Sequence, residues 1–82
     1  MILPTKSIGQ DLALLTVGAQ IIQQLERPAT VSAAWDRVTS FRTSINAPSA
    51  LPFWWFALAL DLLFTMGAIE LADGQLMRSN AP

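Results

Sequence analysis

The carboxylates are the side chains of this chain best suited to acid–base or metal chemistry, because the sequence contains neither histidine nor cysteine. Histidine is the commonest general base and metal ligand, and cysteine supplies thiolates and disulfides. The carboxylates are Asp11, Glu26, Asp36, Asp61, Glu70 and Asp73. Catalysis by such groups requires two of them to converge in one pocket.

Local sequence explains several of these carboxylates without a reaction. Asp11 lies near the start of a predicted helix, where the helix dipole favours a negative charge. Asp73 belongs to an Asp-Gly turn, and Asp36 and Glu26 are expected to be solvated. The glycines are isolated, so they form no phosphate-binding loop. We therefore expect a protein that is not an enzyme and holds no cofactor and no metal ion.

Asp61 differs because it is the one charge within the apolar segment 53–66. On a helical wheel, one side of this segment is typical of a core face: Phe53, Phe56, Ala59, Leu60, Leu63 and Gly67. The opposite side carries Trp54, Leu58, Asp61, Leu62 and Thr65. A helix that is apolar all round is normally buried on all sides, and a chain of 82 residues offers little protein to cover both. We expect a partner to cover the second side, with Trp54, Trp55, Leu58, Asp61 and Leu62 as candidate partner-binding residues.

Alternative roles exist for the residues on this segment. Asp61 is either a solvent-facing polar position or an acid that pairs with a basic group of a partner, because a buried carboxylate needs a partner or its pKa rises. Trp54 and Trp55 are adjacent and must point in different directions. Each either packs in the core or serves as an interface hot spot, whereas Trp35 is expected to be a core residue.

A single-pass membrane peptide is a third interpretation, because residues 50–69 are long enough to cross a bilayer and carry one charge. Pro52 and Gly67 argue against it, since they limit the helix to a length below that of a membrane span. The N-terminus lacks a basic segment followed by an apolar one, so it does not resemble a signal peptide. We expect a cytoplasmic protein that does not bind a membrane.

The charge pattern does not favour nucleic-acid binding. The chain has a net charge of −1, and only 13% of its residues are charged, against about 25% in average soluble domains. The basic residues are scattered: Lys6, Arg27, Arg37, Arg42 and Arg78. The third helix has no side chain suited to reading bases, so the arginines could make only auxiliary DNA contacts within a complex. A small DNA-binding regulator is the alternative function.

Apolar periodicity predicts two helices before the segment 53–66. Residues 1–8 are expected to form an irregular arm, with Ser7 and Gln10 as a capping box, followed by an amphipathic helix over 9–25. Its apolar face is expected to contain Leu14, Leu15, Val17, Gly18, Ile21, Ile22 and Leu25. Thr30 is a candidate N-cap for a second helix over 31–42. Residues 43–52 form the predicted loop, and Ser49 is a candidate cap for the third helix.

A hairpin is predicted after Gly67, which is a candidate helix C′ residue. Asp73-Gly74 favours a type I′ turn, which pairs Ala72 with Gln75, Leu71 with Leu76 and Glu70 with Met77. Ile69, Leu71 and Leu76 are then expected to rest on the helices, and residues 79–82 to fray. Three helices followed by a two-stranded wing give a mainly α, α+β fold of the winged helix-turn-helix class, in a single domain over residues 1–82.

The chain resembles the middle component 6 family of the ABC-three component systems. The resemblance rests on segments in the same order along nearly the whole chain: residues 2–6, Thr30-Val31-Ser32 followed by Trp35, residues 56–64, residues 67–71, and Asp73-Gly74. It implies a small winged-helix subunit of a prokaryotic anti-phage or anti-plasmid defence system. The expected partners are an SMC-like or Rad50-like ABC ATPase and a variable effector subunit of the same operon, with possible self-association. The family has no known catalytic residues to carry over.

Overall fold

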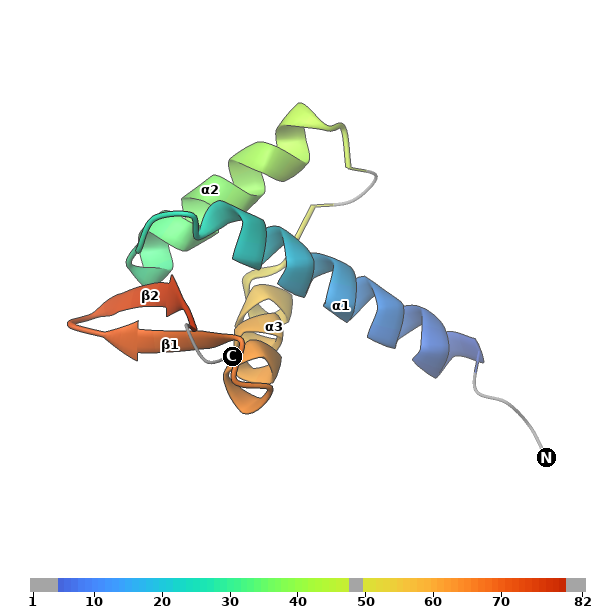
Figure 1. The fold of residues 1–82 in the computed structure, drawn as a ribbon. Coiled ribbons are helices and arrows are strands. Elements are labelled where there is room, and N and C mark those ends of the chain that lie inside the picture. The colour runs from blue at the N-terminus through green and yellow to red at the C-terminus, as the bar shows by residue number, and fades with distance from the viewer. Residues whose placement is uncertain (1–4, 48–49, 80–82) are drawn as a thin grey trace.

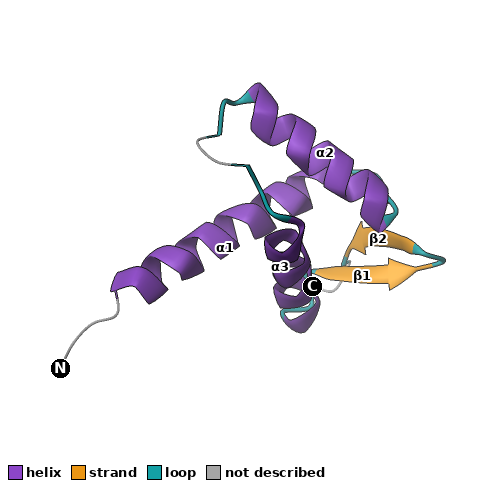
Figure 2. Ribbon diagram, turned by 180° about the vertical axis from the view of Figure 1, so that it is seen from behind, coloured by secondary structure: helices purple, strands orange, loops and turns teal. Residues whose placement is uncertain are grey.

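The computed structural model describes residues 5–47 and 50–79, which form three helices followed by an antiparallel hairpin. The elements are α1 (Thr5–Gln24), α2 (Val31–Ser44), α3 (Phe53–Thr65), β1 (Ile69–Ala72) and β2 (Gln75–Arg78). α1 runs between α2 and α3, and its N-terminal half extends beyond both (Figures 1 and 2). This arrangement confirms the predicted mainly helical, winged-helix-like fold.

All three helices and both strands contribute to one core cluster. Its largest fully buried side chains are Phe56, Ile21, Leu25, Leu76 and Val38. The buried residues Val17 and Ile21 are four residues apart on one face of α1, and Leu25, directly after the helix, continues the same spacing. Burying each large side chain contributes about 1.5–3 kcal/mol, so the hairpin is held to the helices mainly through Leu76 and Ile69.

The predicted irregular arm over residues 1–8 is wrong for its second half, because α1 already begins at Thr5. Ser7 lies inside the helix and is therefore not an N-cap of a capping box. An interior glycine costs only about 1 kcal/mol relative to alanine, so Gly9 does not prevent the helix from starting before it. Residues 1–4 lie outside the described residues.

A side-chain cap begins α2, and a backbone motif ends it. The Thr30 hydroxyl accepts a hydrogen bond from the Ala33 N–H (3.1 Å), which confirms the predicted N-cap. The helix runs to Ser44, two residues beyond the predicted end. Asn46 then has a φ of 54°, and the Ala47 N–H donates to the Arg42 carbonyl (2.9 Å). This is the Schellman arrangement with asparagine in the left-handed position.

α3 ends as the sequence predicts but begins differently. Gly67 has a φ of 74°, and the Ala68 N–H donates to the Leu63 carbonyl (2.9 Å), so Gly67 is the C′ residue of a second Schellman motif. The N-cap position is Pro52, which makes no side-chain cap. The candidate cap Ser49 lies outside the described residues.

The hairpin has the predicted register. Ala72 pairs with Gln75, Leu71 with Leu76, and Glu70 with Met77. Asp73 and Gly74 have φ values of 53° and 76°, and positive values at both central residues are what a type I′ turn requires. Local turn chemistry thus determines the pairing of the strands.

One predicted contact of the hairpin is wrong. Ile69 and Leu76 are buried, but the Leu71 side chain is 57% exposed. Leu71 and Leu76 are on the same face of the hairpin. Leu71 lies on β1, the outer strand, whereas Leu76 lies on β2, which bonds to Ala29 in the α1–α2 connection. The helices therefore cover Leu76 and not Leu71.

The C-terminal prediction also needs correction at its first residue. Ser79 was expected to fray with residues 80–82, but its N–H donates to the Ala68 carbonyl at 2.9 Å. This bond continues the hairpin ladder by one pair beyond Arg78. Residues 80–82 lie outside the described residues.

Length and apolar character together decide whether a helix can cross a bilayer. Among the described residues, no helix combines them sufficiently to do so.

Candidate protein-docking surface

Three of the five candidate partner-binding residues are exposed on one side of α3. Trp54 is 64% exposed, Leu58 is 45% exposed, and Asp61 is also exposed. Their spacing of four and three residues aligns them along the helix. They lie opposite the side that buries Phe56 and Leu63 in the core. We refer to Trp54, Leu58 and Asp61 as the docking face.

The other two candidates lie on a flank of α3. Trp55 and Leu62 are half-buried, and Trp55 packs against the core cluster. They are seven residues apart, so they share one flank between the docking face and the core. The structure therefore does not bring all five candidates into one exposed set, because one flank of α3 is partly covered by the rest of the fold.

The exposed apolar surface instead extends over the other flank of α3. Phe53 was expected to face the core, but it is 52% exposed, and Phe64 is 39% exposed. Phe53 is the first residue of the helix and lies at the rim of the core, where its ring packs edge-on against Trp35 with centroids 5.1 Å apart. Sequence periodicity missed this flank because apolar residues occur on every side of the helix.

Trp54 is held by its neighbour. The rings of Trp54 and Trp55 lie at 89° to each other with centroids 5.2 Å apart, an edge-to-face arrangement. Because Trp55 packs on the core, it provides a fixed surface for the more exposed ring. A ring that is already oriented loses less side-chain entropy on binding, which suits Trp54 to anchor a contact.

Asp61 is the one charged residue of the docking face. Its side chain is exposed, and the Thr65 hydroxyl donates to its backbone carbonyl (2.9 Å) and not to its carboxylate. Among the described side chains, none donates to that carboxylate. The acid is therefore available to a basic group from outside the chain, at the edge of an apolar area.

The arginines considered for auxiliary DNA contacts bond within the fold. Arg37 donates to the carbonyls of Gln24 (3.0 Å) and Arg27 (3.1 Å), and Arg78 donates to the carbonyl of Ile22 (2.9 Å). α1 has no basic residue in its last turn. Arginines from α2 and β2 therefore supply the positive charge and donors that a helix C-terminus favours.

A comparison with protein-family models matches residues 3–80 to the ABC-three component system Middle Component 6 family. The match covers nearly the whole chain. The protein belongs to this family. Comparisons with curated proteins and with solved structures found no match.

Membership confirms the family predicted from the sequence and makes this chain a middle component of an ABC-three component system. The family description implies association with the other components of the system. It does not assign residues to that association, so the docking face of this middle component rests on its own geometry.

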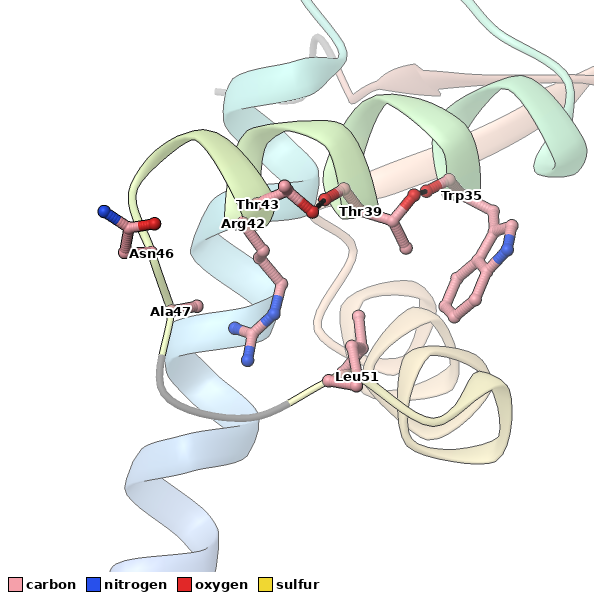
Figure 3. Close-up of a pocket in the computed structure, with 8 residues that line it drawn as sticks. Trp35, Thr39, Arg42, Thr43, Asn46, Ala47 and Leu51 are labelled. Carbon is pink, nitrogen blue, oxygen red and sulfur yellow. Dashed lines mark hydrogen bonds between the residues drawn. The ribbon is translucent and has the colours of Figure 1, made fainter.

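Two hollows flank the α2–α3 connection of the middle component. The one in Figure 3 is lined by residues including Trp35, Arg42 and Leu51. The Thr39 and Thr43 hydroxyls on its wall donate to carbonyls of their own helix, at 2.9 Å to Trp35 and 3.0 Å to Thr39. The Arg42 guanidinium, which reaches both hollows, donates to Gln20 Oε1 at 3.1 Å. These two hydroxyls and this guanidinium thus bond within the fold.

The described carboxylates are dispersed rather than gathered. Within residues 5–47 and 50–79, no three Asp, Glu, His or Cys side chains lie close enough to hold a metal ion together. The linings of the two hollows contain no carboxylate among the described residues. The feature of the middle component that stands out is its exposed apolar surface.

Part of that surface lies on α1. Leu12 and Leu15 are 60% and 50% exposed, although Leu15 was expected to face the core. The N-terminal half of α1 extends past α2 and α3 (Figure 2), so fewer residues are available to cover it. The three-residue spacing of these leucines indicates a shared helix face, but no sequence signal shows where α1 leaves the core.

Proposed function

We propose that this middle component is a non-catalytic adaptor that docks on a partner protein through α3. The observation that carries the proposal is the exposure of Trp54 and Leu58 beside Asp61, on a helix whose opposite side forms the core. Exposed tryptophan with leucine in an apolar patch is typical of protein interaction sites. The adaptor itself requires no cofactor and no metal ion.

The docking face supplies both affinity and orientation. The exposed Trp54 ring would enter an apolar pocket of the partner, supported from behind by Trp55. Asp61 would pair with an arginine or lysine at the rim of that pocket. Such a charge pair fixes the relative orientation of two proteins more than it adds affinity. Phe53 and Phe64 would extend the apolar contact along one flank.

The partners that fit this role are the other components of the system, an SMC-like or Rad50-like ABC ATPase and an effector subunit. The mechanism we propose is positional: the adaptor holds the effector beside the ATPase, so that the state of the ATPase controls the effector. In this scheme the complex acts in the cytoplasm against phage or plasmid DNA, and DNA contact by the adaptor is at most auxiliary.

The Leu58→Glu variant tests the docking face. Leu58 is exposed and glutamate is a good helix former, so the fold should be retained while the charge enters the interface. We expect recovery of the ATPase or effector with the tagged protein, expressed from its native operon, to fall by at least tenfold, a loss of about 1.4 kcal/mol or more. Leu62 is half-buried and is a poorer site for this charge.

Leu12→Glu on α1 is the matched control, because it introduces the same charge at an exposed leucine outside the docking face. It should leave recovery unchanged. If Leu58→Glu retains its partners while Leu12→Glu loses them, the protein docks through α1 and the proposal for α3 is wrong. Circular dichroism of both variants verifies that the fold is intact.

A further inference from the structure

Asp61 lies between apolar side chains on the exposed side of α3. Successive helix residues are about 100° apart, so Leu58 and Phe64 lie about 60° to either side of Asp61 around the helix axis. Trp54 lies about two turns before Asp61 on nearly the same line. These three apolar side chains are exposed, Leu58 at 45%, Phe64 at 39% and Trp54 at 64%. A protein that covers Leu58 and Phe64 together must therefore also cover the Asp61 carboxylate.

The group that pairs with this carboxylate must come from outside α3. Removing a carboxylate from water is costly unless a basic group or hydrogen-bond donors take the place of the water. Asp61 is the single charged residue of α3, so the helix itself contains no basic side chain. The protein that covers this side of α3 has to supply the positive charge.

A second copy of the chain does not supply that charge through the same helix. Two α3 helices packed against each other would contribute an apolar area and one carboxylate each, and no basic residue. In any register, the two Asp61 carboxylates would face either each other or uncharged side chains of the other copy. The first arrangement is repulsive and the second leaves a charge buried without a partner. Asp61 therefore opposes association of two copies through α3.

We propose that Asp61 determines which protein the docking face accepts. It excludes a second copy of the chain and admits a partner segment that is apolar and carries a basic side chain opposite Asp61. The inference rests on the proposed docking through α3 and adds its selectivity. A charge that the wrong partner leaves unpaired is a common source of specificity between proteins. Exposed apolar patches otherwise favour association, so the same acid keeps the free chain from pairing with itself through this helix.

The Asp61→Leu variant of the full chain tests the exclusion of a second copy. Leucine removes the charge, makes the apolar area continuous between Leu58 and Phe64, and is a good helix former. We expect Asp61→Leu to self-associate at concentrations at which the natural chain does not, as measured by sedimentation equilibrium. Adding Leu58→Glu to this variant should reverse the association, which would locate the contact on α3. An Asp61→Leu chain that associates no more than the natural chain would overturn the proposal.

The Asp61→Asn variant tests the requirement for a basic side chain. Asparagine keeps the size of the side chain and removes its charge, so the basic group of the partner would be covered without its acid. We expect recovery of the other components with the tagged protein, expressed from its native operon, to fall by at least about tenfold. Asp36→Asn is the matched control, because it removes the same charge from an exposed position on α2, and it should leave recovery unchanged.

Comparison with Leu58→Glu separates this inference from the proposed function. If Leu58→Glu loses the partners while Asp61→Asn retains them fully, α3 docks without a basic group, and the inference is wrong although the docking function stands. If both variants retain the partners, the docking function is wrong and the inference fails with it. Loss of the partners in both variants, with retention in Asp36→Asn, is the result that supports both.

Discussion

At the scale of single residues, adjacent tryptophans have different roles. Trp55 is half-buried and packs on the core, whereas Trp54 is 64% exposed and rests edge-on against it. Neighbouring helix positions point about 100° apart, so one ring can support the fold while the other is presented to a partner. The sequence identifies both as candidates, but only their burial separates the roles.

Alanine substitutions should separate these two roles. Trp54→Ala should weaken partner binding by about 2 kcal/mol and change the free energy of unfolding by less than about 0.5 kcal/mol. Trp55→Ala should lower the free energy of unfolding by about 2 kcal/mol, below the range for fully buried aromatic residues. Urea denaturation and quantitative pull-down measure the two effects. Equal loss of stability in both variants would contradict this division.

At the scale of elements, α2 and α3 end through local backbone geometry rather than through tertiary contacts. α2 and α3 both finish in Schellman motifs, with Asn46 and Gly67 at φ values of 54° and 74°. The second motif directs the chain from α3 into β1 within a few residues. The position of the wing therefore depends on a residue that tolerates the left-handed region.

Gly67→Ala should lower the free energy of unfolding by about 1–2 kcal/mol, the cost of the left-handed conformation for a residue with a Cβ. A clash with other parts of the fold does not contribute, because beyond the adjoining residues nothing lies within 4 Å of the position of the added Cβ. Gly67→Asn is the matched control and should lose less, since asparagine adopts this conformation more readily. A loss for asparagine as large as that for alanine, measured by urea denaturation, would argue against a conformational cause.

At the scale of the whole molecule, arginines from different elements converge on α1. Arg37 of α2 donates hydrogen bonds to a carbonyl at the C-terminal end of α1 and to the carbonyl of Arg27. Arg78 of β2 donates to a carbonyl at the same end of α1, and Arg42 of α2 donates to the Gln20 side chain. A small domain buries a limited fraction of its surface and has marginal stability. Hydrogen bonds from charged groups to carbonyls are among the stronger ones, so these contacts supplement a small core.

Arg37→Met should lower the free energy of unfolding by about 1–2 kcal/mol, because it removes two hydrogen bonds to carbonyls while keeping most of the aliphatic chain. Arg27→Met is the control: its side chain is exposed and its carbonyl, which accepts from Arg37, is unchanged. We expect less than about 0.5 kcal/mol there. Thermal unfolding of both variants measures the difference, and a similar effect in both would point to loss of charge alone.

The sequence by itself determines the features that depend on a few neighbouring residues. The Thr30 cap, the Gly67 helix end and the register across Asp73-Gly74 were all predicted, because capping and turn chemistry act within one or two turns of chain. The order of three helices and a wing follows from these signals and from apolar periodicity. The start of α1 was missed because no residue between Thr5 and Gly9 marks it strongly.

The tertiary structure decides which apolar side chains are covered. Leu71 and Leu76 are paired and share a face, yet only Leu76 lies beneath the helices. Phe53 and Leu15 were expected in the core and are exposed, and Trp55 and Leu62 are half-buried beside the docking face. Burial depends on where distant elements cross, and a sequence rich in apolar residues on every side of a helix does not encode that crossing in its local pattern.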